Sequence, residues 1–85
     1  MSYDVVYLDD VVRKDIPPLD AQVRSIIRAA IEEKLATNPV KFGKPLQYSL
    51  KGCRRLRVGD WRVIFQLEGQ RVTIVKIGHR REIYR

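Results

Sequence analysis

The last eight residues gather side chains that could carry out proton transfer and phosphate binding. They run Gly-His-Arg-Arg-Glu-Ile-Tyr-Arg from Gly78 to Arg85, with one imidazole, three guanidinium groups and one phenol. Cleavage of RNA by its own 2′-hydroxyl needs a base for that hydroxyl, cations for the charge on phosphorus, and an acid for the leaving 5′-oxygen. His79 and Tyr84 are the candidate base and acid. The candidate cations are Arg55, Arg57, Arg62 and Arg80.

Both proton-transfer candidates also have a plainer interpretation. Tyrosine has an unperturbed pKa of about 10, so it is a poor base at neutral pH unless nearby cations favour the phenolate. Tyr84 can instead be a terminal aromatic residue that covers the edge of the core, and His79 can be a surface histidine. The residues alone leave these alternatives open.

The charge of the chain is concentrated in its second half. The 85 residues carry 17 Lys and Arg against 10 Asp and Glu, which gives a formal net charge of +7. Residues 1–43 contribute −1 and residues 44–85 contribute +8, and eight of the eleven basic residues in the second half are Arg. This positive charge excludes a partner that is bound because it is itself positively charged. It favours nucleic acid, an anionic surface or an acidic protein. The arginine bias points to phosphate, because the arginine side chain matches phosphate geometry. In this half we also take the cations Lys51 and Arg81 as RNA-binding candidates.

Signals for cofactors and for membranes are absent from the sequence. With one cysteine, Cys53, and one histidine, the chain offers neither an internal disulfide nor metal-ligand spacing. It contains no phosphate loop and no dinucleotide-binding glycine motif. The N-terminus lacks the apolar run of a signal peptide, and no apolar run approaches the ~20 residues of a membrane span. We therefore expect a soluble, cytoplasmic protein that needs no cofactor and binds no membrane.

The N-terminal half predicts one strand and two helices. Residues 3–8 are rich in β-branched and aromatic side chains, which is typical of a short strand. Asp9 and Asp10 can cap a short helix that ends near Ile16, before two prolines. A second helix should begin after Asp20. Its apolar stripe comprises Val23, Ile26, Ile27, Ala30, Ile31 and Leu35.

A long connection and three strands should complete the chain. The connection covers residues 38–53, with one helical turn between Leu46 and Leu50. Alternating apolar residues then predict three strands, over 54–58, 61–67 and 72–77. The order β-α-α-β-β-β predicts a single α+β domain over residues 1–85, with two N-terminal helices packed on one face of an antiparallel sheet.

The Gly59-Asp60 turn determines how the first two of these three strands pair. A two-residue turn with glycine places Arg57 directly opposite Arg62. Facing the helices we expect Leu56, Val58, Trp61, Val63, Phe65, Leu67, Val72 and Ile74. On the opposite face we expect Arg55, Arg57 and Arg62 over Ile64, Val75 and Ile77. Like charges directly opposite destabilise a sheet, so the cluster indicates either a bound polyanion or a solvated face with splayed side chains. Neither Arg62 nor Arg80 should be needed for folding.

Two stretches of this sequence resemble the RelE/ParE toxin superfamily, and in particular its RelE branch of ribosome-dependent mRNA endonucleases. The first runs from Gly52 to Phe65 and contains Arg-Leu-Arg-Val-Gly-Asp-Trp-Arg. The second runs from Ile77 to Tyr84 and contains Ile-Gly-His-Arg. Residues 42–46, the chain length and the order of elements also resemble the family, so the resemblance covers nearly the whole chain.

The resemblance implies a toxin that cuts mRNA in the ribosomal A site and is held inactive by an antitoxin. Its partners would be the ribosome, mRNA and a cognate acidic antitoxin. Family positions that grip the substrate match Arg55 and Arg57. Arg62 matches the arginine that stabilises the phosphate, and Arg80 the arginine near the leaving group. Tyr84 matches the C-terminal tyrosine proposed as the base.

The C-terminal stretch also raises a geometric expectation. His79 stands where relatives often carry Lys or His. Strict alternation from Ile77 would put Arg80 on the helix face, so we expect a bulge or turn at Gly78. ParE-type gyrase poisons share the scaffold without the RNase residues, so gyrase inhibition is the alternative function, and a non-catalytic RNA-binding module is a third.

Overall fold

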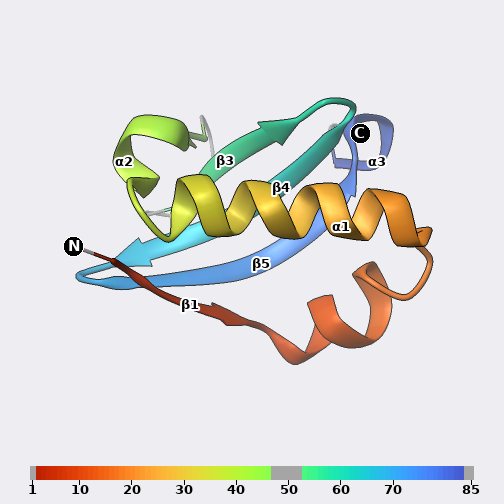
Figure 1. Cartoon of the computed structure of the whole chain (residues 1–85), viewed down its shortest axis with the longest axis horizontal. Helices are drawn as coiled ribbons and strands as arrows, with labels where there is room; N and C mark the ends of the chain where they lie inside the picture. The colour runs from red at the N-terminus through yellow and green to blue at the C-terminus, as the bar shows by residue number, and fades with distance from the viewer. Residues whose placement is uncertain (1, 47–52, 84–85) are drawn as a thin grey trace.

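The fold has two layers, a sheet and the helical segments that cross one of its faces (Figure 1). In the computed structural model, residues 2–46 and 53–83 are described. The predicted order of elements is confirmed, with three short elements added, α2, β2 and α3. The elements are β1 (Asp4–Tyr7), η1 (Val11–Asp15), α1 (Ala21–Ala30), η2 (Ile31–Leu35), α2 (Pro39–Phe42), β2 (Lys44–Pro45), β3 (Cys53–Val58), β4 (Trp61–Glu68), β5 (Arg71–His79) and α3 (Arg80–Ile83).

The long helix begins where the sequence predicts. Asp20 caps α1, because its side chain accepts a hydrogen bond from the Val23 N–H at 2.8 Å. The helix continues without a break into η2. The predicted apolar stripe is confirmed except at Ile26, which is 52% exposed. The buried line passes through residues four apart, and Ile26 lies about 100° around the axis from Ile27.

Two predicted details of the N-terminal half differ in the structure. The short helix η1 forms, but the Asp10 side chain makes no capping hydrogen bond. The predicted connection contains regular structure, since Asn38 caps α2 and Lys44 of β2 pairs with Arg55 of β3. The helical turn predicted between Leu46 and Leu50 lies outside the described residues. Within the described ranges, no helix is long and apolar enough to cross a membrane.

The sheet is antiparallel over four of its five strands. The strand order is β1-β5-β4-β3-β2. Neighbours from β2 to β5 run antiparallel, as predicted, but β1 pairs with β5 in parallel, with Val5 opposite Val72. β1 and β5 come from opposite ends of the chain, so no tight turn fixes their relative direction.

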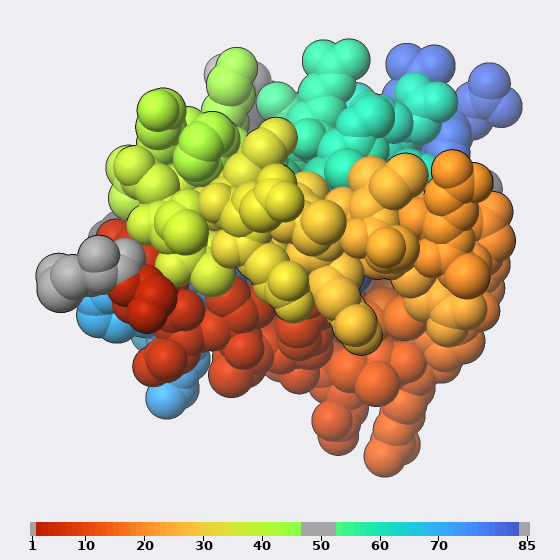
Figure 2. All heavy atoms as spheres, in the orientation of Figure 1, coloured from red at the N-terminus to blue at the C-terminus, as the bar shows by residue number. Residues whose placement is uncertain are grey.

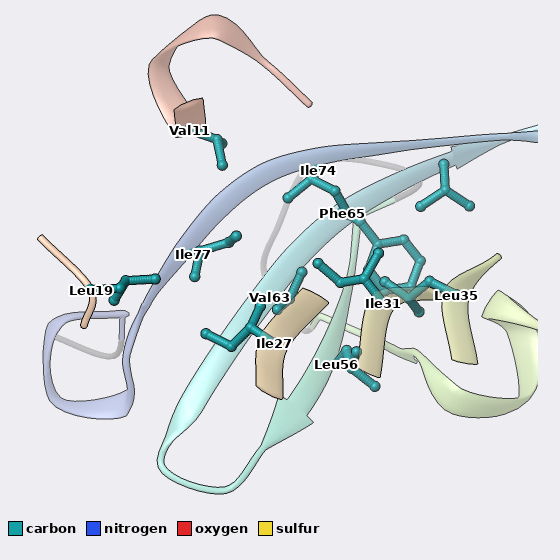
Figure 3. Packing of buried hydrophobic residues seen from close by; sticks show 11 residues of the cluster. Val11, Leu19, Ile27, Ile31, Leu35, Leu56, Val63, Phe65, Ile74 and Ile77 are labelled. Carbon is teal, nitrogen blue, oxygen red and sulfur yellow. The ribbon is translucent and has the colours of Figure 1, made fainter. Parts of the chain in front are cut away.

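The core lies between the sheet and the helix formed by α1 and η2 (Figure 3). Val63, Phe65 and Ile74 are fully buried on the sheet side, and Ile31 and Leu35 cover them from the helix. Burying each such side chain contributes about 1.5–3 kcal/mol. The predicted helix-facing side of the β3–β4 hairpin is therefore confirmed.

A bulge in β5 changes the predicted positions near the C-terminus. Phe65 pairs with Ile74 but Ile64 pairs with Lys76, so Val75 has no partner in β4. The extra residue puts Ile77 opposite Val63 on the helix-facing side, where it is 3% exposed. The prediction of Ile77 on the arginine side was therefore wrong, and the expected irregularity lies at Val75 rather than Gly78.

The edge of β5 beyond β1 is closed by a side chain. β1 ends opposite Ile74. On the edge of β5 that faces away from β4, no strand among the described residues pairs with the residues after Ile74. There the Asp15 carboxylate accepts a hydrogen bond from the Ile77 N–H at 2.9 Å and one from Lys76 Nζ at 3.1 Å. These bonds attach η1 to β5 and pair a backbone donor that a strand would otherwise pair.

Candidate active site

The β3–β4 hairpin has the predicted register. Arg55 pairs with Ile64 and Arg57 with Arg62, around a turn in which Gly59 has a φ of +60°. Alternation along the strands therefore places these three arginines on the side of the sheet opposite the core. Arg57 is exposed and Arg55 is half-buried. This confirms that the sheet presents a basic side away from the helices.

Arg62 is buried, unlike its cross-strand partner Arg57. Its exposed fraction is 6%, and its Nη1 donates to the carbonyl oxygens of Gly59 at 2.8 Å and Trp61 at 2.9 Å. A buried guanidinium needs such acceptors because its desolvation is costly. Arg62 therefore binds the backbone of its own hairpin turn, a contact that favours a contribution to stability; its dispensability for folding stays a prediction.

The same turn also holds Arg80 at the start of α3 (Figure 1). The Arg80 N–H donates to the Asp60 carbonyl oxygen at 2.8 Å. The Arg80 Nε lies 3.7 Å from Asp60 Oδ1, with both side chains more than half exposed. Two arginines that are 18 positions apart in the chain thus converge on one two-residue turn. From the sequence, Asp60 is predicted only as a turn residue, although it is one of three acids in residues 44–85.

Gly78 allows the C-terminal segment to fold back on the arginine side. Gly78 pairs with Arg62, so a side chain there would point to the same side of the sheet as Arg62. A Cβ at this position would lie 3.2 Å from Ile83 Cδ1. Ile83 of α3 therefore packs over the bare Gly78 backbone, next to Arg62. Tyr84 and Lys51 lie outside the described residues.

His79 lies on the other side of the sheet from Arg57 and Arg62. It pairs with Trp61, and the two rings meet edge to face with centroids 5.3 Å apart. Its Nδ1 accepts a hydrogen bond from the Arg81 N–H at 3.2 Å, which leaves Nε2 to carry the proton of a neutral ring. The structure brings Arg55, Arg57 and Arg62 together on one side, and Arg80 to their turn, but it directs His79 away from them. Arg81 is exposed on α3.

The remaining features of the described residues do not add to this cluster. No three His, Cys, Asp or Glu side chains in the described ranges gather where they could hold a metal ion. A hollow lies on the helix side, between α1 and the segment that contains η1 (Figure 2). Leu19, Ile27, Arg28 and Ile77 contribute to its lining. Partial burial beside it raises the pKa of Tyr7 above its ordinary value. This hollow opens away from the arginine side.

The sequence matches one toxin family over almost its full length. Residues 4–84 match the family described as the ParE toxin of type II toxin–antitoxin system, parDE. Toxin RelG of Mycobacterium tuberculosis is 28% identical over 75 residues, which cover 86% of this chain and 86% of that protein. Toxin RelE of the same organism is 31% identical over 74 residues, covering 85% of this chain and 76% of that protein.

Solved structures share the fold. The chain superposes on the RelBE2 toxin–antitoxin complex of Mycobacterium tuberculosis with a TM-score of 0.85 at 23% identity, covering 93% of this chain and 99% of that one. For the isolated RelE toxin of E. coli the TM-score is 0.74 at 15% identity, covering 92% of this chain and 84% of that one. At these identities the likeness shows the fold, and it confirms the architecture expected from the sequence.

Proposed function

The chain belongs to the ParE toxin family of type II toxin–antitoxin systems, and on this premise we propose that it is an endoribonuclease that cleaves mRNA on the ribosome. Its named relatives include RelE and RelG toxins. The observation that carries the proposal is the attachment of Arg62 and Arg80 to one hairpin turn beside the exposed Arg57. Such a group of fixed cations suits the charge that develops on a phosphate during cleavage.

The proposed reaction is an internal transfer within the RNA. The 2′-oxygen attacks the adjacent phosphorus, the bond from phosphorus to the 5′-oxygen breaks, and a 2′,3′-cyclic phosphate forms. A base removes the proton of the 2′-hydroxyl, and an acid protonates the leaving 5′-oxygen. We assign the base to Tyr84 and keep His79 as the other candidate for proton transfer.

The arginines have separate proposed roles. Arg62 supplies positive charge at the phosphate, and because the fold already holds its guanidinium, no reordering is needed when the charge develops. Arg80, which is half exposed, stabilises the leaving group. The proposed contacts to the RNA backbone come from Lys51, Arg55, Arg57 and Arg81.

The proposed protein partner is an acidic antitoxin. Several solved relatives are toxin–antitoxin complexes, among them RelBE2 and the intact RelBE complex of E. coli. The sequence predicted an apolar floor on the arginine side, but Ile64 is buried and Ile77 belongs to the core, which leaves the half-buried Val75. Recognition of this side should therefore depend on charge, and complex formation should weaken steeply as salt is raised. Co-purification with the product of the neighbouring gene over a salt series tests this.

The experiment that tests the nuclease is induced expression in growing bacterial cells, followed by mapping of mRNA 5′ and 3′ ends. The proposal expects cuts inside translated codons, and none when Arg80→Ala is expressed at the same level. Intact mRNA together with gyrase-dependent DNA breaks would instead support gyrase inhibition, the alternative that the ParE family match favours. RNA binding without cuts or DNA breaks would leave a non-catalytic binding module. The cytoplasm, where mRNA is translated, is the proposed place of action.

A further inference from the structure

We infer that Asp60 is a positioning residue that orients the Arg80 guanidinium toward the substrate phosphate; this inference rests on the proposed nuclease function. Asp60 contacts Arg80 twice, through its carbonyl oxygen to the Arg80 N–H at 2.8 Å and through Oδ1 to Nε at 3.7 Å. The first contact fixes where the Arg80 backbone lies. The second restricts the direction of its side chain.

The turn that carries Asp60 is itself held in place. Gly59 supplies the positive φ that the turn requires, and Arg62 Nη1 binds the carbonyl oxygens on both sides of Asp60, those of Gly59 and Trp61. Asp60 is thus a fixed point at the end of the hairpin. Its contact with the Arg80 side chain restricts that side chain too, which reduces the conformational freedom that Arg80 must lose when the substrate binds.

The atom that Asp60 faces is informative. A guanidinium has five donor hydrogens in a planar fork, and the contact at Nε uses the inner edge of that fork. A contact on the Nε side leaves the opposite edge, formed by the terminal Nη1 and Nη2, and that edge can bind two phosphate oxygens side by side. A carboxylate beside a phosphate site also repels the substrate, so removing it has two opposite effects. Orientation of Arg80 is lost, and repulsion of RNA is reduced.

Loss of Arg80 orientation should lower kcat, and reduced repulsion of RNA should lower KM, so the two constants are measured separately. Because the Asp60–Arg80 pair is exposed, its loss should cost only about two- to fivefold in kcat, the range expected for surface ion pairs. In Asp60→Asn we expect kcat to fall by that factor in a cleavage assay on ribosomes programmed with a defined mRNA, while KM decreases because repulsion of the RNA is reduced. A purely structural role would lower the active fraction instead and leave KM unchanged, with a lower unfolding temperature.

The matched control is Glu68→Gln, which also removes a carboxylate beside a two-residue turn, at the opposite end of the sheet. It should leave kcat and KM at their wild-type values. On an Arg80→Ala background, Asp60→Asn should produce no further loss, because the side chain that it orients is gone. Asp60→Glu should recover part of the lost kcat.

Failure of this inference is distinguishable from failure of the nuclease proposal. If the wild-type chain cleaves mRNA but Asp60→Asn has the same kcat, or if its effect persists in full on the Arg80→Ala background, Asp60 does not position Arg80. If the wild-type chain does not cleave programmed mRNA, both proposals fall. NMR relaxation of the Arg80 Nε–H gives a readout without substrate, and unchanged order in Asp60→Asn would also overturn the inference.

Discussion

The two hairpin turns of the sheet have nearly the same backbone and very different surroundings. Gly59 in the β3–β4 turn has a φ of +60°, and Gly69 in the β4–β5 turn has a φ of +57°. The first turn receives the Arg62 guanidinium and two contacts from Arg80. At the second turn, Gln70 accepts a backbone hydrogen bond from the Asp4 N–H at 2.8 Å, which joins β1 to the sheet.

The difference shows that turn geometry and turn use are separate properties. Antiparallel strands joined by two residues require a positive φ, and glycine supplies it equally well at both ends of the sheet. Among the contacts of residues 2–46 and 53–83, cationic side chains bind the β3–β4 turn from β4 and from α3 and none binds the β4–β5 turn in this way. The β4–β5 turn instead lies among Asp4, Glu68 and Arg71, where acidic and basic groups are mixed. The proposed phosphate site thus lies at one end of the sheet.

Arg80→Ala tests the largest expected difference between the two ends. Removal of one fixed donor at a developing charge typically costs about 100- to 1000-fold in kcat. We expect a loss of that size in ribosome-programmed mRNA cleavage. Arg71→Ala, which removes an arginine beside the other turn, should cleave at the wild-type rate. Equal losses in both variants would mean that total charge, rather than the β3–β4 end, determines activity.

Arg62→Ala tests whether the buried guanidinium stabilises its turn. Loss of hydrogen bonds from a charged group to the Gly59 and Trp61 carbonyls should lower the free energy of unfolding by about 1–3 kcal/mol. Arg57→Ala is the matched control on the facing strand. Because it removes a like charge from an exposed position, it should be neutral or slightly stabilising. Urea denaturation of the three proteins measures this, and an equally unstable Arg57→Ala would contradict it.

Paired glycine substitutions separate backbone strain from function. A Cβ at Gly59 or Gly69 meets no atom within 4 Å, so Gly59→Ala and Gly69→Ala both carry only the cost of a positive φ, about 1–2 kcal/mol. Thermal unfolding should show similar losses for the two variants. Cleavage measured well below both unfolding temperatures should fall only in Gly59→Ala, since that turn carries Asp60. Equal activities would show that the site tolerates movement of its turn.

Asp4→Asn is expected to have the smallest effect. The substitution keeps the backbone N–H that binds Gln70 and removes one charge from the mixed group at the β4–β5 turn. Its unfolding free energy should stay within about 0.5 kcal/mol of wild type, as for most surface changes. Cleavage should not change. A clear loss of activity would assign a role in the reaction to the β4–β5 end.

The sequence was most informative where a single residue type dictates the backbone. Glycine in a two-residue turn fixed the register of β3 against β4. The register in turn determines the side of the sheet from which the side chains of Arg55, Arg57 and Arg62 project. The helix-facing residues followed from alternation, because a slip by one position would have exposed them all. Both expectations depend on local geometry, and both are confirmed.

The sequence was least informative about a strand irregularity, about side-chain hydrogen bonds to the backbone, and about contacts between distant parts of the chain. Val75 lies in an unbroken β-branched run that gives no sign of a bulge, so Ile77 was assigned to the wrong side. Burial of Arg62 depends on its guanidinium folding onto carbonyls of its own turn, which residue type alone does not reveal. The contact of Asp60 with Arg80 depends on where α3 begins. The proposed roles of Tyr84 and Lys51 concern residues outside the described ranges, and those roles stay predictions.

The Asp15 carboxylate at the edge of β5 affects whether separate molecules of this chain can join through their sheets and aggregate. An open strand edge is where sheets of separate molecules join and aggregate, and natural sheets protect such edges with charged groups or covering segments. Asp15 occupies the Ile77 N–H and places a negative charge and a lysine at the same point on the edge. An incoming strand would have to displace this ion pair before it could form its first hydrogen bond. A small side-chain contact therefore favours solubility of the folded chain over self-assembly at this edge.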